Sequence, residues 1–241
     1  ANSVRVPGII VSLFFVSWSA VSMAAPTVVV NNGRINNAKL AAVVVDPCAG
    51  ENVGDVCSNG VLYAGSGFAG LGSYKYMTTP GHCSGFVNNY TGFTPTCTGA
   101  TDDLGYSWAA NNDDPSACYT PVAGDLPCNV TTGATSTTNG SGNTATLALN
   151  YVDTDAARYC ENMTYPAGGY TDWYLPSKDE LDLVLYAMHT AGKGNFAADT
   201  YWSSTEATAA TGWSEDFSTG WQNAGPYKTD GYGVRCVRKY L

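Results

Sequence analysis

The clearest pattern of hydrophobic and polar positions lies in the C-terminal third of the chain. Ser177 is followed three residues later by Glu180, the spacing of a capping box, in which a hydroxyl and a carboxylate bind free amides at a helix start. Apolar residues then recur at i, i+3, i+4 and i+7, namely Leu181, Val184, Leu185 and Met188. The pattern predicts an amphipathic helix that begins near Lys178 and ends near Gly192.

Short runs rich in β-forming residues predict strands on both sides of this helix. Val61–Ala64 and Tyr74–Thr79, joined across the glycine-rich Gly65–Ser73, predict a hairpin. A sheet that carries Tyr201 and Trp202 is the expected partner of the helix. Two further strands are expected at Trp213–Phe217 and, after a turn at Ser218–Gly220, at Tyr232–Arg238.

The remaining sequence is less regular. A second helix is expected over Thr154–Asn162, with Asp153 or Thr154 as its N-cap. Residues 80–146 are dominated by turn-forming residues and predict loops without a helix. Residues 36–45 fit either a short helix or a strand, because so short a run does not separate the two periods.

The N-terminal stretch is apolar and admits two interpretations. No charge occurs from Val6 to Val30, Arg5 precedes this stretch, and Ser22–Ala24 offers small residues for cleavage, which is the layout of a signal peptide. The chain begins with Ala1 instead of Met, which favours a retained segment that spans a membrane or packs with copies of itself. The residues expected to drive such assembly are Ile9, Ile10, Leu13, Phe14 and Phe15.

Composition narrows the class of protein. Only 13% of the 241 residues are charged, and 20 acidic against 11 basic residues give a net charge of -9. This acidic balance excludes nucleic acid and anionic membrane surfaces as expected partners. A chain with few charges and many Gly, Ser, Thr, Asn and Tyr residues is typical of a secreted, loop-rich β protein.

The eight cysteines predict disulfides made in an oxidising compartment. None lies in a C-x-x-C motif or in a Cys/His cluster with zinc spacing. The first six form close pairs along the chain, separated by turn-rich sequence. The expected bridges are Cys48–Cys57, Cys83–Cys97, Cys118–Cys128 and the long-range Cys160–Cys236.

Aromatic residues near the C-terminus indicate a ligand platform. Trp202, Trp213, Trp221, Tyr227 and Tyr232 offer rings, and Glu206, Glu215, Asp216 and Asn223 offer polar contacts to a sugar. Aromatic strand residues mostly pack in cores, and this is the favoured interpretation of Trp202. Trp221 follows a glycine in a turn and is the better exposed candidate. The predicted ligand-binding residues are Trp221, Asn223, Asp216, Glu215 and Trp213.

Other candidate chemistry is weaker. His82 adjoins Cys83, a pairing used in nucleophilic catalysis, but a bridged cysteine has no thiol, and no enzyme activity is expected. His189 lies near the end of the predicted helix, where the dipole favours a cation. The pairs Asp102-Asp103 and Asp113-Asp114 offer oxygens to calcium, but solvated turns explain them more simply, so no metal or other cofactor is expected. Glycosylation sequons occur at Asn89, Asn129, Asn139 and Asn162.

Four motifs follow one another near the C-terminus: Tyr159–Asn162, Trp173–Leu181, Tyr201–Thr205 and Val234–Arg238. In this order they resemble the Lcl C-terminal domain family of bacterial surface domains, over residues 151–241. Gly54–Cys57 and Met77–Gly81 resemble the upstream part of many such proteins. The resemblance implies an α+β, C-type-lectin-like fold with two helices and short antiparallel strands, distantly similar to formylglycine-generating enzymes.

The resemblance also bears on ligands. Members of the family include collagen-like adhesins that attach to glycosaminoglycans, but sulfated ligands need a basic patch, and this chain is acidic. The Glu-Pro-Asn and Trp-Asn-Asp motifs of calcium-dependent lectins do not occur. An apolar N-terminal helix ahead of a disulfide-bonded domain also resembles the plan of type IV pilins, which usually carry an acidic residue where Arg5 stands here.

These patterns predict three parts: an apolar segment at 1–30, a linker and the start of the head at 31–60, and a disulfide-bonded, lectin-like head at 61–241. The expected function is that of a structural filament subunit on a bacterial cell surface, which binds copies of itself through the N-terminal segment and displays the head for adhesion. The alternative is a secreted or surface-anchored adhesin that binds host or matrix glycans without polymerising. An enzyme of the formylglycine-generating type ranks third.

Overall fold

The computed structural model describes residues 46–81, 83–84, 92, 94–97, 105–109, 130–151 and 154–241, which all belong to one compact unit. Several sequence-based predictions lie outside these residues. They are the N-terminal segment with Ile9, Ile10, Leu13, Phe14 and Phe15, the run at 36–45, His82, the Asp102-Asp103 and Asp113-Asp114 pairs, Cys118 and Cys128, and the sequons at Asn89 and Asn129.

The first sheet joins the beginning and the end of the described chain. Strands β1 (Leu62–Ser66) and β2 (Lys75–Thr78) form the predicted antiparallel hairpin, and β10 (Val237–Tyr240) pairs with the other edge of β2. The strand order is therefore β1-β2-β10. Alternate residues of β2 point to opposite faces, so Tyr76 and Met77 are both fully buried but belong to two different hydrophobic clusters.

The second sheet is formed within the C-terminal motifs. Strands β6 (Thr200–Glu206), β7 (Gly212–Asp216) and β8 (Trp221–Asn223) are antiparallel in the order β6-β7-β8. Two small pairs complete the strands: β3 (Cys83–Ser84) with β4 (Thr96–Cys97), and β5 (Tyr106–Ser107) with β9 (Gly231–Tyr232).

The expected strand over Tyr232–Arg238 is wrong as a single element. Its start is β9 and its end is β10, and the two belong to different sheets. Between them the Arg235 guanidinium is buried and donates to the carbonyl oxygens of Thr79 (3.0 Å) and Gly194 (2.8 Å). This inward turn of a charged side chain toward backbone acceptors interrupts the alternation that a continuous strand requires.

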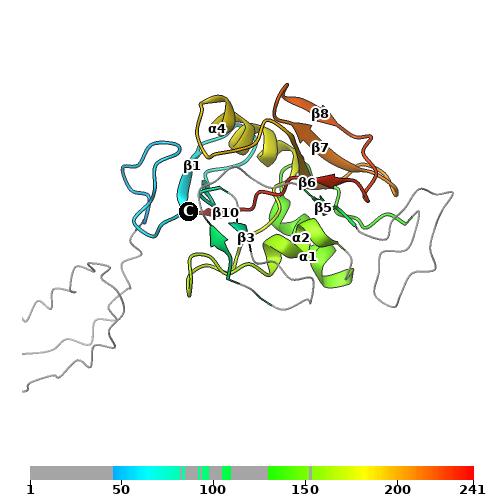
Figure 1. Ribbon diagram of the computed structural model, residues 1–241, viewed down its shortest axis with the longest axis horizontal. Helices are drawn as coiled ribbons and strands as arrows, with labels where there is room; N and C mark the ends of the chain where they lie inside the picture. Colours follow the sequence, from blue (N-terminus) through cyan, green and yellow to red (C-terminus); the bar gives the residue numbers. More distant parts are fainter. Residues whose placement is uncertain are drawn as a thin grey trace, which may run out of the picture. The chain divides into compact units, whose positions relative to one another are not determined.

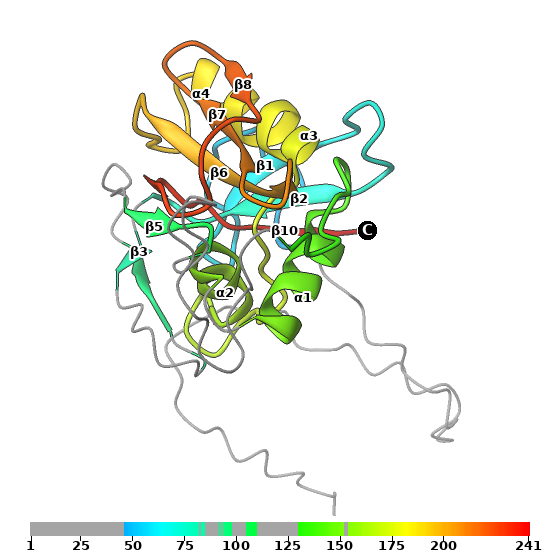
Figure 2. The same ribbon diagram turned by 90° about the vertical axis from the view of Figure 1, so that its right-hand side faces the viewer.

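The helices lie on two sides of the strands. Helices α1 (Gly140–Asn150) and α2 (Asp155–Glu161) pack together on one side. The predicted amphipathic helix forms the other side as α3 (Lys178–Glu180), the π-helical η1 (Leu181–Tyr186) and α4 (Ala187–Thr190). Figures 1 and 2 both show the α1–α2 pair and the α3–α4 segment separated by the strands. The architecture is α+β, with short antiparallel strands, as predicted.

Helix α1 corrects the prediction that residues 80–146 contain no helix. Asn139 caps it, with its Oδ1 accepting from the Gly142 amide (3.3 Å). Its buried positions, Gly140, Asn143, Thr144 and Leu147, keep the i, i+3, i+4, i+7 spacing, but only one of them is a large apolar residue. Thr144 exchanges hydrogen bonds with the backbone of Leu175 (3.2 and 3.0 Å), so tertiary contacts stabilise a helix that hydrophobic periodicity does not reveal.

The amphipathic helix confirms its sequence signals. Both halves of the Ser177–Glu180 capping box are present, and the four predicted apolar residues are buried. Gly192 follows the C-terminus with a φ of +69°, and the amide of Lys193 donates to the Met188 carbonyl, which closes the last turn. The helix packs on Tyr201 and Phe217, whereas Trp202 faces the other hydrophobic cluster.

Three of the four predicted disulfides lie among the described residues and are confirmed: Cys48–Cys57, Cys83–Cys97 and Cys160–Cys236. The last joins α2 to the residue before β10 across a sequence separation of 76. A bridge that closes so long a loop removes much unfolded-chain entropy, worth about 4 kcal/mol on the chain-entropy model.

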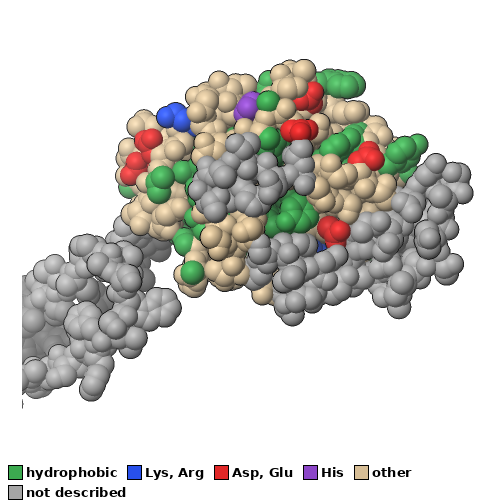
Figure 3. All heavy atoms as spheres, in the orientation of Figure 1, with side chains coloured by type: hydrophobic (Ala, Val, Ile, Leu, Met, Phe, Trp, Pro, Cys, Tyr) green, Lys and Arg blue, Asp and Glu red, His purple; other side chains and the backbone are tan. Residues whose placement is uncertain are grey.

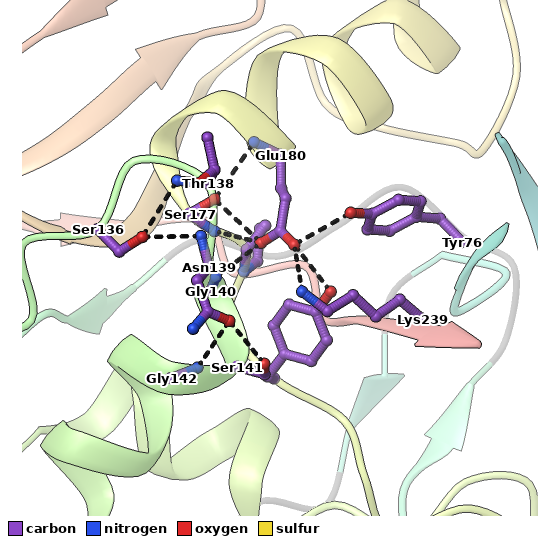
Figure 4. Close-up of polar contacts among 12 residues, drawn as sticks. Tyr76, Ser136, Thr138, Asn139, Gly140, Ser141, Gly142, Ser177, Glu180 and Lys239 are labelled. Atoms are coloured by element: carbon purple, nitrogen blue, oxygen red, sulfur yellow. Dashed lines mark hydrogen bonds and ion pairs between the residues drawn. The ribbon is translucent and has the colours of Figure 1, made fainter. Parts of the chain in front are cut away.

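The Glu180 carboxylate ties several of these elements together (Figure 4). Its Oε1 accepts from the hydroxyls of Tyr76 (3.2 Å) and Tyr174 (3.0 Å) and from Lys239 Nζ (3.3 Å). Its Oε2 accepts from the amides of Gly140 and Ser177 and from the Ser177 hydroxyl, each at 3.0 Å. A Cβ on Gly140 would lie 2.4 Å from this oxygen, so the helix α1 start needs glycine to approach the carboxylate.

Candidate functional site

The β6-β7-β8 sheet has two faces with different environments. Cross-strand rows follow from the register: Thr200 opposes Asp216, which opposes Trp221, and Ser214 opposes Asn223. Because strand side chains alternate, these five residues share one face, here called the open face. The residues between them point to the helix face, against α3 and η1. They include Tyr201, Trp213, Glu215 and Gln222.

The open face carries a shallow hollow of about 110 Å³, here called the Trp221 hollow. Its lining residues are Thr200, Ser214, Asp216, Trp221, Asn223 and Tyr232. Trp221 is 66% exposed, although it is the largest side chain in the lining. Figure 3 shows hydrophobic and acidic side chains side by side over β7 and β8. The hollow therefore combines an exposed aromatic face with polar groups from three strands.

The turn between β7 and β8 fixes the position of Trp221. The Asp216 carboxylate accepts from the Ser218 amide (2.8 Å), the Ser218 hydroxyl (2.6 Å) and the Thr219 hydroxyl (3.0 Å). Gly220 has a φ of +75°, and a Cβ there would lie 2.5 Å from the Tyr186 hydroxyl oxygen of η1. The tryptophan thus stands on a hydrogen-bonded turn that packs against the helix.

The hollow is negatively charged. Hydrogen bonds from Ser218, the largest influence, and from Thr219 lower the pKa of Asp216 below its usual value, so the carboxylate is ionised at neutral pH. Burial, followed by the nearby Asp230 charge, raises the pKa of Tyr232, which keeps its phenol neutral. The ring of Tyr232 packs against Trp202, with 4.7 Å between centroids.

Ser214 and Thr200 belong to the hollow and were missed by the sequence analysis. Ser214 is 3% exposed, and its hydroxyl oxygen is buried without a hydrogen-bond partner. The available signal was alternation: in Trp213-Ser214-Glu215-Asp216, residues 214 and 216 must share a face. A prediction that paired Asp216 with its neighbour Glu215 could not be right for a strand.

Two of the five predicted ligand-binding residues, Trp213 and Glu215, lie on the helix face, away from Trp221, Asn223 and Asp216. Trp213 is half-buried, with Lys178 Nζ 5.0 Å from its ring centroid. Glu215 is fully buried, and neither of its oxygens makes a hydrogen bond of normal geometry. Strand alternation is the physical reason for the separation.

The surroundings of Glu215 perturb its acidity. Burial, followed by the charge of Asp182 on η1, raises the pKa of Glu215 to about 8. Gln222 and Lys178 lie close enough to act in the opposite direction. Glu215 is consequently protonated at neutral pH and stands behind the strand that carries the hollow.

Three other members of the proposed platform do not line the hollow. Trp202 is fully buried, as favoured by the sequence analysis. Glu206 is not a surface contact: it is 5% exposed and ion-paired with the buried Lys228 at 2.6 Å. Tyr227 is 46% exposed but bridges to Thr211 beyond the far end of β7, and it does not line the hollow.

Of the residues considered for catalysis or metal binding, Cys83 and His189 lie within the described part of the chain. Cys83 is bridged to Cys97, and His189 packs against the rings of Phe217 and Phe196, 5.3 and 6.2 Å away between centroids. Within the described ranges, no group of three or more His, Cys, Asp or Glu residues could hold a metal ion. The same part of the chain contains no helix long and apolar enough to cross a membrane.

Comparison with known proteins identifies the family to which this domain belongs. No curated protein matches the chain. The family model of the Lcl C-terminal domain matches residues 100–238, which include α1, α2, the capping-box helix, the β6-β7-β8 sheet and every residue of the Trp221 hollow. The match covers more than half of the chain and contains all four motifs recognised in the sequence, and the chain belongs to the Lcl C-terminal domain family.

Proposed function

We propose that this is a bacterial surface or extracellular protein whose head binds neutral glycans at the Trp221 hollow. Family membership and the disulfides favour such a location. The observation that carries the binding proposal is the exposure of Trp221, at 66%, beside convergent polar side chains. The α+β head is further proposed to be C-type-lectin-like.

An exposed tryptophan on a fixed turn suits sugar binding. Its indole presents a rigid apolar surface at low conformational cost, and the C–H face of a hexose ring can cover it. Asp216, Asn223, Ser214 and Thr200 supply hydrogen-bonding groups around that surface. Binding sites are commonly built from such an aromatic face and a few polar groups that set orientation.

Charge favours a neutral sugar over a sulfated or carboxylated one. The chain carries a net charge of -9, and the ionised Asp216 lies within the hollow itself. An anionic ligand would approach against this field and would meet a carboxylate without a compensating cation in the lining. The hydroxyls of a neutral sugar, in contrast, can donate to Asp216.

Glycan-array binding of three purified proteins tests this function: the wild type, Trp221→Ala and Tyr227→Ala. We expect the wild type to bind neutral hexose glycans, Trp221→Ala to lose binding at least about tenfold, and Tyr227→Ala to bind normally. Tyr227 is the matched control because it is an exposed aromatic outside the hollow. Equal binding by wild type and Trp221→Ala would exclude the hollow as the site.

A second candidate is a subunit of an extracellular filament. It is favoured by the uncharged stretch from Val6 to Val30, whose apolar residues could pack with copies of the same chain. Negative-stain imaging of sheared cell surfaces should then show filaments that disappear in a Phe14→Asp/Phe15→Asp variant. If only monomeric protein is found and it still binds glycans, the filament hypothesis is excluded and the protein is an adhesin that does not polymerise.

Both candidates are binding or structural functions without catalysis. A formylglycine-generating activity would need reactive thiols, and the cysteines at 48, 57, 83, 97, 160 and 236 are bridged. With Cys118 and Cys128, which lie outside the described residues, bridged to each other as the sequence predicts, thiol titration of the folded protein should detect no reactive pair. Two titratable thiols would revive the enzyme hypothesis.

A further inference from the structure

The Ser214 hydroxyl is an unusual group in this domain. The residue is 3% exposed and sits within β7, and its Oγ is buried without a hydrogen-bond partner. Ser203 provides a contrast on the neighbouring strand, since its hydroxyl donates to the Trp213 carbonyl at 2.9 Å. Buried polar groups without partners cost folding free energy and are rare in native structures. Ser214 therefore calls for a partner that the chain itself does not supply.

The direction of Ser214 points to where that partner lies. Ser214 lines the Trp221 hollow from the central strand of the sheet, with β6 on one side and β8 on the other. Its backbone is paired on both sides, opposite Trp202 and Asn223, so strand alternation keeps its side chain on the open face together with Asp216. The remaining direction for a hydrogen bond is into the hollow.

We propose that Ser214 determines specificity in the Trp221 hollow by hydrogen-bonding a hydroxyl of the neutral sugar that stacks on Trp221. This inference rests on the proposed glycan-binding function and deepens it. It assigns a role to a residue that contributes neither charge nor apolar area. The stacking surface sets which class of molecule binds, and the serine sets how that molecule is oriented.

The chemistry of the hollow specifies a hydroxyl as the bound group. A serine hydroxyl both donates and accepts, and the ionised Asp216, two residues along the same face, only accepts. Their Cα atoms are about 6.6 Å apart on a strand, a span that two neighbouring sugar hydroxyls can bridge. One hydroxyl then accepts from Ser214 and the other donates to Asp216. A carboxylate or sulfate could not donate to Asp216 and would be repelled by it.

The experiment compares three variants, Ser214→Ala, Ser203→Ala and Trp221→Ala, with wild type in the full chain. Binding is measured on immobilised mannose, galactose, glucose and N-acetylglucosamine conjugates, with glucuronic acid and sialic acid conjugates as anionic probes. Thermal unfolding is recorded in parallel. Ser203→Ala is the matched control because it removes a hydrogen-bonded hydroxyl from the neighbouring strand of the same sheet, at a residue that does not line the hollow.

We expect ligand binding and thermal stability to change independently in these variants. Ser214→Ala should weaken binding of the preferred neutral sugar about tenfold or more, because one hydrogen bond to the ligand is lost. Its melting temperature should equal or exceed that of the wild type, because the variant removes an unpaired buried group. Ser203→Ala should show the reverse: a lower melting temperature and unchanged binding. A merely structural role for Ser214 would not produce this combination.

Three results would overturn the inference, and they are distinguishable. If Trp221→Ala abolishes binding but Ser214→Ala binds as the wild type does, the glycan site stands and water alone satisfies Ser214. If Ser214→Ala melts lower than the wild type, the hydroxyl has a structural partner. If the wild type binds none of the probes, the glycan function itself fails, and the role of Ser214 fails with it.

Discussion

Two fully buried glutamates, Glu180 and Glu215, lie in the same domain in opposite surroundings. Both oxygens of Glu180 accept several hydrogen bonds, from α1, β2, β10 and the capping box (Figure 4). Neither oxygen of Glu215 makes a hydrogen bond of normal geometry, and the side chains that act on it are Asp182, Gln222 and Lys178. One region is held together by its buried carboxylate, and the other is weakened by one.

The difference separates buried polar groups that stabilise the fold through hydrogen bonds from buried polar groups that lack partners within the chain. A buried carboxylate with a full set of donors stabilises every element that supplies a donor. A buried carboxylate or hydroxyl without donors lowers stability, and such groups gather on β7, where Glu215 faces the helix and Ser214 faces the hollow. The β7–β8 hairpin therefore combines buried polar groups that lower stability with the candidate binding site.

The largest expected effect is at Glu180. Glu180→Ala should lower the free energy of unfolding by about 4 kcal/mol, because it leaves Tyr76, Tyr174 and Lys239 with unmet or uncompensated polar groups. Urea unfolding measures the effect. Asp179→Ala is the control: it removes a neighbouring, partly exposed carboxylate and should cost less than about 1 kcal/mol. Equal losses of unfolding free energy in the two variants would show that the hydrogen bonds of Glu180 do not stabilise the head more than a partly exposed carboxylate does.

Glu215→Gln should have the opposite sign and should depend on pH. The pKa of Glu215 is about 8 when folded against an ordinary value of 4.5, so the folded chain keeps a proton that the unfolded chain releases. The free energy of unfolding of the wild type should therefore fall as pH rises from about 4.5 to about 8. Each pKa unit corresponds to about 1.4 kcal/mol.

Because local movement relieves part of this cost, we expect Glu215→Gln to exceed the wild type by about 3 kcal/mol at pH 9 and to match it near pH 4. Urea unfolding across this pH range measures the difference. A wild-type curve that runs parallel to that of Glu215→Gln would show that Glu215 is not buried without a partner. Asp182, Lys178 and Gln222 remain unchanged in this comparison, so the effect isolates one proton.

A smaller effect is expected at the cap of α1. Asn139→Ala should cost about 1 kcal/mol, because the Gly142 amide loses its acceptor, while Asn139→Asp should retain most of the stability. Circular dichroism during urea unfolding tests this pair of variants. If both lose stability equally, the helix does not depend on the cap.

The smallest expected effect on stability is at Trp221. Because the side chain is 66% exposed, Trp221→Ala should change the free energy of unfolding by less than about 0.5 kcal/mol, although it is expected to weaken glycan binding at least about tenfold. Chemical unfolding and array binding of the same preparation measure both quantities. A loss of stability comparable to that of Glu180→Ala would show that Trp221 stabilises the fold and would contradict a role confined to ligand binding.

The candidate site was only partly predictable. Trp221, Asn223 and Asp216 do line one hollow, since their positions around the turn could be inferred from Ser218–Gly220. Trp213 and Glu215 were grouped with them because they are near in sequence, but the pleat of β7 directs them to the helix face. Strand alternation could have placed Ser214 beside Asp216, but the burial of its hydroxyl without a hydrogen-bond partner is known only from the tertiary structure.

The sequence by itself determined the features that depend on neighbouring residues. The capping box, the buried stripe of the following helix, the β1–β2 hairpin and two short disulfide loops are set by spacing over a few residues. Such features need no knowledge of what lies across the molecule. They account for the α+β class and for the frame of the head.

Only the tertiary structure decided which polar groups are satisfied. Helix α1 is stabilised by hydrogen bonds from Gly140, Asn143 and Thr144 to distant segments of the chain. The sequence has no apolar periodicity that would predict this helix. Likewise, Glu180 and Glu215 are the same residue type, and each follows an acidic or polar neighbour in sequence. Their opposite roles follow from strand register and helix packing, because the hydrogen bonds and desolvation of a buried group are set by contacts made across the chain.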